Sequence, residues 1–285
     1  MQQFYLRYPG FRRKALLLSF DDGHKEDLRF QTLLKCFGIK GTFNINSGYL
    51  TGKLPEETPS SIRLSIREVQ QLLENGHELA IHTYSHPFLS TLPAGQVAAQ
   101  ILYDRCALEQ LCPQATLITG LALPFEAEAN AEVFQAAKAC GITYIRSLTP
   151  SYRFSLPMDF YRWHVTCHFR DPRFEELCRN FLAGRPTWTS EVFFVWGHSH
   201  ELRTKEDWNS WERACSQLGG HEDIWYAGCG ELCDYVRAAG CLQSSADGKT
   251  IYNTSATTLY VESDPTGMQI TLHPGQQVQL EWSIL

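Results

Sequence analysis

The sequence predicts an α/β fold with a largely parallel sheet and a smaller antiparallel β segment near the carboxyl terminus. Segments typical of strands alternate with segments typical of helices from residue 15 to residue 239, as in successive β–α units. We count about seven units, too many for a simple three-layer sheet and one short of a regular eight-fold barrel. From Lys249 onward, polar and apolar residues alternate between Asn, Asp-Pro and Pro-Gly turns. We therefore expect a main domain over residues 1–245 and a β-strand appendage or small accessory module over residues 246–285.

The predicted strands are short apolar runs bounded by glycine, proline or polar residues. The first, Ala15–Phe20, contains three consecutive leucines, which is typical of a strand buried on both faces. The other strands of the alternating region are expected at Thr42–Ile45, Leu79–His82, Thr116–Leu121, Ile142–Arg146, Val192–Val195 and Ile224–Tyr226. Those of the carboxyl-terminal segment are expected at Thr250–Tyr252, Thr257–Val261, Met268–Leu272 and Gln277–Trp282.

The predicted helices follow from apolar periodicity and from capping signals. Apolar residues recur at i, i+3, i+4 and i+7 from Phe30, which predicts an amphipathic helix that ends at Gly38. Ser65 and Glu68 have the spacing of a capping box and predict the start of a second helix. Further helices are expected at Ala94–Leu111, Ala129–Cys140, Phe174–Phe181, Trp208–Leu218 and Gly230–Ala239.

Composition and charge argue against two classes of partner. The net charge is −6, and Arg12-Arg13-Lys14 is the only short basic run, so we expect no nucleic-acid partner. No apolar run reaches the roughly 20 residues of a membrane helix, so we expect no membrane partner. The first nine residues show no secretory leader, which predicts a cytoplasmic protein, or an extracellular one if a leader has been removed.

The chain contains ten cysteines, and apolar, helix-like patterns contain five of them: Cys36, Cys106, Cys140, Cys178 and Cys215. Buried free thiols are the simpler interpretation, because the chain is not a small secreted domain. An alternative is a structural zinc site formed by His221, Cys229, Cys233 and Cys241, although their spacing fits no standard zinc signature.

Two polar motifs stand where predicted strands end. Asp21 and Asp22 follow the first apolar strand, and His82 and His86 follow the strand that begins at Leu79. One carboxylate and two imidazoles make a facial ligand set that leaves coordination positions open for water and substrate. The remaining carboxylate is then free to act as a base.

Each motif also has a simpler interpretation. An Asp-Asp-Gly sequence is typical of a turn or a helix cap, and two histidines four residues apart are common on a solvated helix face. The histidine motif also lacks the glutamate that follows the first histidine in H-E-x-x-H proteases. The occurrence of both motifs at the carboxyl ends of strands favours a metal site.

The same residues carry a resemblance to a known family. Ser19-Phe20-Asp21-Asp22-Gly23 resembles the first motif, T/S-F-D-D-G, of the polysaccharide deacetylases (carbohydrate esterase family 4, or NodB homology domain). His82-Thr83-Tyr84-Ser85-His86 matches their second motif, H-S/T-x-x-H. The resemblance extends to about residue 240. It implies a distorted seven-stranded (β/α) barrel, Asp21 as the catalytic base, and a divalent metal on Asp22, His82 and His86.

The third motif departs from the family pattern. Leu123-Pro124-Phe125 resembles a variant that keeps the backbone shape but lacks the usual arginine, which orients the catalytic aspartate in the family. Arg146, at the end of the next predicted strand, is our candidate for that role, with an ordinary surface ion pair as the alternative. We expect the backbone N–H of Phe125 to assist in stabilising an oxyanion.

The fourth and fifth motifs concern three further residues. Trp163 corresponds to the tryptophan of the fourth motif, where Arg162 replaces an aspartate; it is expected either to line the acetyl pocket or to lie in the core. Val195-Trp196-Gly197-His198 resembles the fifth motif, which implies that His198 is the general acid. His200 follows two residues later, and we expect it to act through packing or substrate contact.

The resemblance implies a metal-dependent hydrolase that removes acetyl groups from an N-acetylated sugar or glycan. One alternative is an O-acetyl esterase or small-amide hydrolase on the same scaffold. Another is a barrel that binds glycan without turnover and uses the β appendage as its docking surface. We expect zinc, although two imidazoles and one carboxylate also accept cobalt, nickel or manganese.

Overall fold

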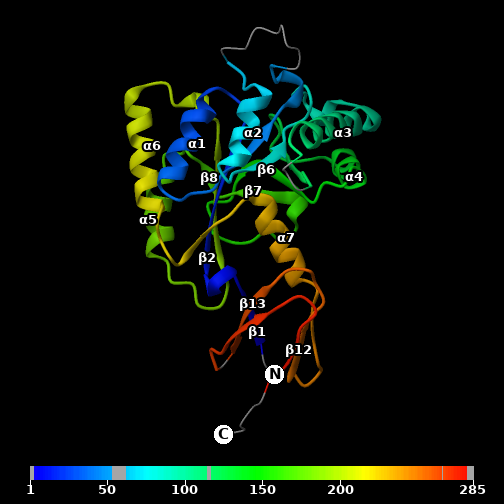
Figure 1. Ribbon diagram of the computed structural model, residues 1–285, viewed down its shortest axis with the longest axis vertical. Coiled ribbons are helices and arrows are strands. Elements are labelled where there is room, and N and C mark those ends of the chain that lie inside the picture. Colours follow the sequence, from blue (N-terminus) through cyan, green and yellow to red (C-terminus); the bar gives the residue numbers. More distant parts are fainter. Residues whose placement is uncertain (1–2, 53–61, 114–116, 265, 281–285) are drawn as a thin grey trace.

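The chain folds into a nearly closed parallel β-barrel with helices around it and antiparallel sheets at one end (Figure 1). The computed structural model describes residues 3–52, 62–113, 117–264 and 266–280. The fold class predicted from the sequence, a distorted seven-stranded (β/α) barrel with a small β appendage, is confirmed.

The barrel sheet runs in the order β7-β6-β5-β4-β3-β2-β9-β8, and every pairing in it is parallel. β7 and β8 are separated only by Thr166, whose backbone N–H donates to the carbonyl of Phe194 in β9 at 2.7 Å. The segment formed by β7 and β8 pairs with β6 on one side and with β9 on the other, so it joins the two edges of the sheet. Counted as one strand, it gives the barrel seven strands. The strands are β2 (Lys14–Asp21), β3 (Thr42–Ile45), β4 (Glu78–Ile81), β5 (Gly120–Ala122), β6 (Tyr144–Pro150), β7 (Trp163–Val165), β8 (Cys167–His168) and β9 (Glu191–Gly197).

Six of the seven barrel strands are among the seven strands that we predicted, and one is not. The predicted strand at 224–226 exists as β10 (Ile224–Tyr226), but it pairs only with the beginning of β2. The seventh strand of the barrel is instead formed by residues 163–168, which we did not predict as a strand. Polar residues interrupt this segment, so its extended conformation depends on pairing with β6 and β9 rather than on local sequence.

Helices follow most of the strands and cover the outside of the barrel (Figure 1). The predicted capping box is present, because the Ser65 N–H donates to the Glu68 carboxylate at 2.7 Å and the Glu68 N–H donates to the Ser65 hydroxyl at 3.4 Å. The helices are α1 (Glu26–Cys36), α2 (Ile66–Glu74), α3 (Ala94–Leu111), α4 (Ala131–Ala139), α5 (Phe174–Ala183), α6 (Lys205–Leu218) and α7 (Cys229–Ala239).

The side chains of β2 alternate between the two faces of the barrel wall. Leu16, Leu18 and Phe20 pack in the cluster that includes helix residues outside the barrel. Ala15 and Leu17 pack in a second cluster with interior residues of β4, β6, β7 and β9. Because strand side chains alternate with a period of two, Asp21 continues the interior row at the carboxyl end of β2.

The appendage consists of two three-stranded antiparallel sheets at the lower end of the molecule (Figure 1). The first has the order β1 (Gln3–Arg7), β13 (Leu259–Asp264) and β14 (Gln269–Leu272). The second has the order β11 (Leu242–Ser244), β12 (Thr250–Asn253) and β15 (Gln277–Gln279).

The expected division at residues 245 and 246 differs from this arrangement at two points. The amino-terminal strand β1 pairs with β13, and β11 already begins at Leu242. The pairing of β1 is reinforced by the buried Arg7, whose Nε donates to Glu262 at 2.9 Å. Local sequence could not reveal this pairing, because the partners lie more than 250 residues apart. Two predicted strands, at 116–121 and 277–282, extend into residues outside the described part of the chain.

All ten cysteines are free thiols. The alternative of a structural zinc site is wrong for this fold: Cys233 donates to the carbonyl of Thr143, and Cys241 to that of Arg237. Among the described residues, the clusters with metal-ligand geometry contain only histidine, aspartate and glutamate. In that same part of the chain, no helix has the length and hydropathy that crossing a bilayer requires.

Candidate active site

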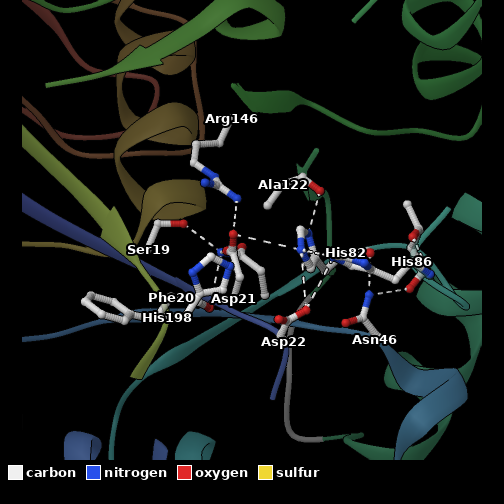
Figure 2. Close-up of polar contacts among 12 residues, drawn as sticks. Ser19, Phe20, Asp21, Asp22, Asn46, His82, His86, Ala122, Arg146 and His198 are labelled. Carbon is white, nitrogen blue, oxygen red and sulfur yellow. Dashed lines mark hydrogen bonds and ion pairs between the residues drawn. The ribbon is translucent and has the colours of Figure 1, made fainter. Parts of the chain in front are cut away.

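Asp21 lies inside the carboxyl end of the barrel and is 1% exposed. Asn44 donates to its Oδ1 at 2.7 Å. Arg146 donates to its Oδ2 at 2.7 Å (Figure 2). Burial alone would raise the pKa of this carboxyl, but the Arg146 guanidinium, with His82 and His198 nearby, lowers it below its ordinary value. Asp21 is therefore ionised at neutral pH.

Arg146 reaches Asp21 from β6 on the opposite wall of the barrel. It shares the interior face of β6 with Tyr144, two residues earlier. Its side chain is fully buried, so the pair with Asp21 is not a surface ion pair. The guanidinium also lies 5.0 Å from the centre of the Trp196 ring, a cation–π contact that fixes its plane. This geometry matches the orienting role considered for Arg146 from the sequence.

The three expected metal ligands come together beside Asp21. The Oδ1 atom of Asp22 lies 3.4 Å from His86 Nε2 and 3.8 Å from His82 Nε2, and the two Nε2 atoms are 3.0 Å apart. Ligand atoms about 2.1 Å from a tetrahedral ion lie about 3.4 Å from one another. The observed separations therefore match three ligands of one ion.

The protonation state of the two histidines also suits metal binding. The Nδ1 of His82 lies 2.9 Å from the carbonyl of Ala122, which sets the tautomer so that Nε2 carries the free lone pair. Burial lowers the pKa of His82, and burial together with His82 lowers the pKa of His86 to about 4. Both imidazoles are therefore neutral at pH 7, as a metal ligand must be.

Buried polar side chains hold the loop that carries the two histidines. Asn46 donates to the carbonyls of His82 and Thr83 at 2.5 and 2.9 Å, and Asp104 accepts from the His82 N–H at 3.0 Å. The loop then reaches His86, whose N–H donates to the Thr83 hydroxyl at 3.1 Å. None of these supports was predicted from the sequence, because asparagine and aspartate in loops are too common to be a signal.

Four residues around the site have positive φ although none is glycine: Asp22 (83°), Thr83 (68°), His86 (56°) and Phe125 (59°). Such conformations cost of order 1–3 kcal/mol each and persist where the surrounding contacts fix them. In addition, Asp22 Oδ1 is buried and accepts no hydrogen bond from a described residue. A buried carboxylate oxygen without a donor is well suited to a cation, so the donor set fits a divalent metal.

His198 lies on the other side of Asp21 from His82 (Figure 2). Its Nδ1 is 2.7 Å from Glu201 Oε1, and the same oxygen lies 3.2 Å from His168 Nε2. Burial opposes the charged form, but Glu201 and the two aspartates raise the pKa of His198 above its ordinary value. A histidine held by a carboxylate through Nδ1 presents Nε2 as its available proton donor.

His200 has a different environment from His198. Its ring packs against that of His24, with the centroids 4.1 Å apart, and its buried Nδ1 has no hydrogen-bond partner among the described residues. Burial and the neighbouring histidines lower its pKa. Because a neutral histidine is a poor proton donor, this environment favours His198 as the acid.

Phe125 and its neighbour Pro124 lie at the rim of the site, where Pro124 is buried and Phe125 is 54% exposed. The Phe125 ring meets the edge of His86 at 4.3 Å and stacks on Phe88 at 4.5 Å. Its backbone N–H donates no hydrogen bond to another described residue, which leaves it available to a ligand. Exposed aromatic rings beside a polar site are typical of a ligand-binding wall.

Trp163 belongs to the core and not to an exposed pocket wall. It is 1% exposed and packs on Tyr144, Phe160 and Phe194 within the barrel. Of the two roles considered for it, the structure therefore favours the core role.

Sequence reasoning missed Glu201, His168 and Asn44. Glu201 had a signal, because it ends the Gly-His-Ser-x-Glu segment that begins at Gly197. His168 and Asn44 had none, since each becomes part of the site only through the pairing of distant strands.

Residues 9–145 match the protein-family model described as polysaccharide deacetylase. This match covers just under half of the chain, which is therefore similar to the polysaccharide deacetylases over that region. Its matched region includes Asp21, Asp22, His82, His86 and Phe125.

A curated chitooligosaccharide deacetylase from Sinorhizobium fredii is 28% identical over 110 residues, which are 38% of this chain and 46% of that protein. The chain therefore matches less than half the length of this relative. Among solved structures, a putative polysaccharide deacetylase from Mycobacterium smegmatis has 16% identity and a TM-score of 0.58, over 83% of this chain and 94% of that one.

A CE4 family pseudoenzyme from Bacillus anthracis has 17% identity and a TM-score of 0.52, over 81% of this chain and 68% of that one. These two likenesses show the fold alone. Since one of the two structures is a pseudoenzyme, any conclusion about activity has to come from the side chains of the site.

Proposed function

We propose that this protein is a metal-dependent hydrolase that removes acetyl groups from an N-acetylated sugar or glycan. The observation that carries the proposal is the joint placement of three groups at the carboxyl end of the barrel. They are an ionised aspartate held by Arg146, a ligand set made of the Asp22 carboxylate and the neutral imidazoles of His82 and His86, and a carboxylate-bound His198.

A divalent metal held by Asp22, His82 and His86 would supply a Lewis acid that polarises the acyl carbonyl and makes a water more acidic. Asp21 removes a proton from the attacking water, since its carboxylate is ionised and adjacent to the ligand set. Arg146 and Asn44 each fix one oxygen of Asp21, so the carboxylate keeps its orientation while it accepts the proton.

His198 donates a proton from Nε2 to the leaving nitrogen, which separates acetate from a free amine on the sugar. Glu201 positions this ring by accepting from Nδ1, and it favours the protonated form that a general acid needs.

The stacked rings of Phe88 and Phe125 support a carbohydrate substrate. They are 51% and 54% exposed, and Phe125 contacts His86 directly. An apolar sugar face that lies on this wall would bring an attached acetyl group next to the ligand set. Replacing Phe88 with alanine should therefore raise KM for a glycan while leaving kcat nearly unchanged, because the ring contacts no reacting atom.

Acetate release tests the proposal, measured on metal-supplemented protein with chitin oligomers, peptidoglycan fragments and acetylxylan. We expect release from an N-acetylated substrate, with one new amine for each acetate. Release from acetylxylan alone would favour the O-acetyl esterase. Binding without release from any of the three would favour the non-catalytic barrel.

A further inference from the structure

A second pair of histidines, His24 and His200, lies beside Asp22. The Oδ2 atom of Asp22 is 3.7 Å from His24 Nε2, whereas its Oδ1 atom faces the first pair. His200 completes the group, because ligand atoms of Asp22, His24 and His200 all lie within 4.8 Å of one another. Asp22 therefore has imidazoles near both of its oxygens, with Oδ1 toward His82 and His86 and Oδ2 toward His24.

The separation between Asp22 and His24 is closer to that of two metal ligands than to that of hydrogen-bond partners. A distance of 3.7 Å between His24 Nε2 and Asp22 Oδ2 exceeds the normal range of an N–H···O bond, which ends at about 3.2 Å. It is close to the separation of about 3.4 Å expected for two ligands of one tetrahedral ion. The same range of separations relates Asp22 to His82 and His86.

A second, independent observation concerns His200. Its Nδ1 is buried and has no hydrogen-bond partner among the described residues. An imidazole nitrogen that is removed from water without a partner costs free energy, and coordination of a cation would remove that cost. The two rings also come from different elements, His24 from the loop after β2 and His200 from the 3-10 turn Ser199–Glu201 after β9.

We propose that Asp22, His24 and His200 form a second divalent-cation site, and that Asp22 bridges it to the first. The ligand set of one carboxylate and two imidazoles is the same in both sites, so both accept ions of the zinc class. The inference rests on the proposed function only in that the first ion is the one held by Asp22, His82 and His86.

Metal stoichiometry tests the proposal without reference to activity. The chain is freed of metal with a chelator, dialysed against a low concentration of Zn²⁺ and analysed for zinc per chain. We expect two ions in the unaltered chain and one in each of His24→Gln and His200→Gln. His82→Gln should also retain one ion, and Asp22→Ala should retain neither, because the bridge is lost.

A matched control uses His273→Gln, since His273 is exposed in the appendage and lies in none of the metal-ligand clusters. It should bind as many ions as the unaltered chain. Any zinc that binds to exposed thiols adds the same amount to every variant. Circular dichroism shows whether each variant is folded. If either His24→Gln or His200→Gln fails to fold, the other still tests the second site.

The outcomes separate the two proposals. One ion in the unaltered chain, lost in His82→Gln but kept in His24→Gln and His200→Gln, would overturn the second site and leave the first intact. No bound ion in the unaltered chain would contradict both. Two ions, of which one disappears in each histidine variant, would establish the pair of sites.

Discussion

The carboxylate of Asp21 and the guanidinium of Arg146 form a buried ion pair across the barrel, with 2.7 Å between Oδ2 and Nη2. Asp21 lies at the end of β2 and Arg146 in β6, so the pair depends on closure of the sheet. Since both side chains are almost wholly removed from water, each charge depends on the other.

Arg146→Ala should leave the charge of Asp21 unpaired and destabilise the protein by roughly 3–5 kcal/mol, measured by urea unfolding. Arg146→Lys keeps the charge but not the fixed geometry, so it should fold and lose kcat. In the lysine variant the pKa of Asp21 should rise, because its closest stabilising cation is more distant.

The acidic limb of the kcat/KM profile of Arg146→Lys should then move to higher pH. The exposed Arg153→Lys is the matched control, and an equal effect of both lysine variants would contradict the role of Arg146.

Asp21 and Asp22 should differ in role although they are adjacent. Asp21→Asn should keep its metal and lose roughly 10²–10⁴ in kcat, because the base is removed. Asp22→Asn should weaken metal binding, since its Oδ1 faces both ligand histidines. Bound metal and kcat measured on the same samples separate the two effects, with the exposed Asp247→Asn as control. Equal metal loss in the Asp21 and Asp22 variants would show that both carboxylates coordinate.

His198 and Glu201 should act together on the leaving group. His198→Ala should reduce kcat for an amide far more than for an activated ester, because an amine leaves poorly without a proton and a phenolate does not. Glu201→Gln should shift the alkaline limb of the amide profile to lower pH, since the carboxylate raises the pKa of His198. His200→Ala should leave the ratio of amide to ester rates nearly unchanged. If the amide-specific loss follows His200 instead, the general acid has been assigned to the wrong histidine.

His77, at the opposite end of β4 from His82, should affect stability rather than catalysis. Burial lowers its pKa to about 4, and its Nδ1 accepts from the Gly41 N–H at 3.2 Å. The unfolded chain therefore binds a proton near pH 6.5 that the folded chain does not. Stability from this group is present above that pH and is lost as pH falls to about 4, by about 3 kcal/mol in total.

Urea unfolding of the unaltered chain and of His77→Gln between pH 7 and pH 4 measures this effect. The difference in the free energy of unfolding between the two should narrow as the pH falls, because only the unaltered chain loses this contribution. Two profiles that stay parallel over this range would show that His77 does not contribute.

Much of the fold could be predicted because its strands have strong local signals. The three leucines of β2 and the capping box at Ser65 identify their elements without tertiary information. The barrel strand at 163–168 and the strand β1 could not be predicted, since both become strands only by pairing with distant parts of the chain.

Some residues of the site could likewise be predicted from the sequence, and others could not. Asp22, His82 and His86 could be found because they occupy the ends of two predicted strands and match family motifs. His168 and Asn44 could not, because a single imidazole or amide in a sequence does not reveal the side chain that it will contact.

We expect Asp22, His82 and His86 to hold one divalent ion beside Asp21. Anomalous diffraction from crystals of the zinc-loaded protein tests it most directly. We predict an anomalous peak about 2.0–2.2 Å from a carboxylate oxygen of Asp22 and from Nε2 of both histidines. Absence of a peak there, or either histidine turned away from Asp22 in the loaded protein, would contradict the account.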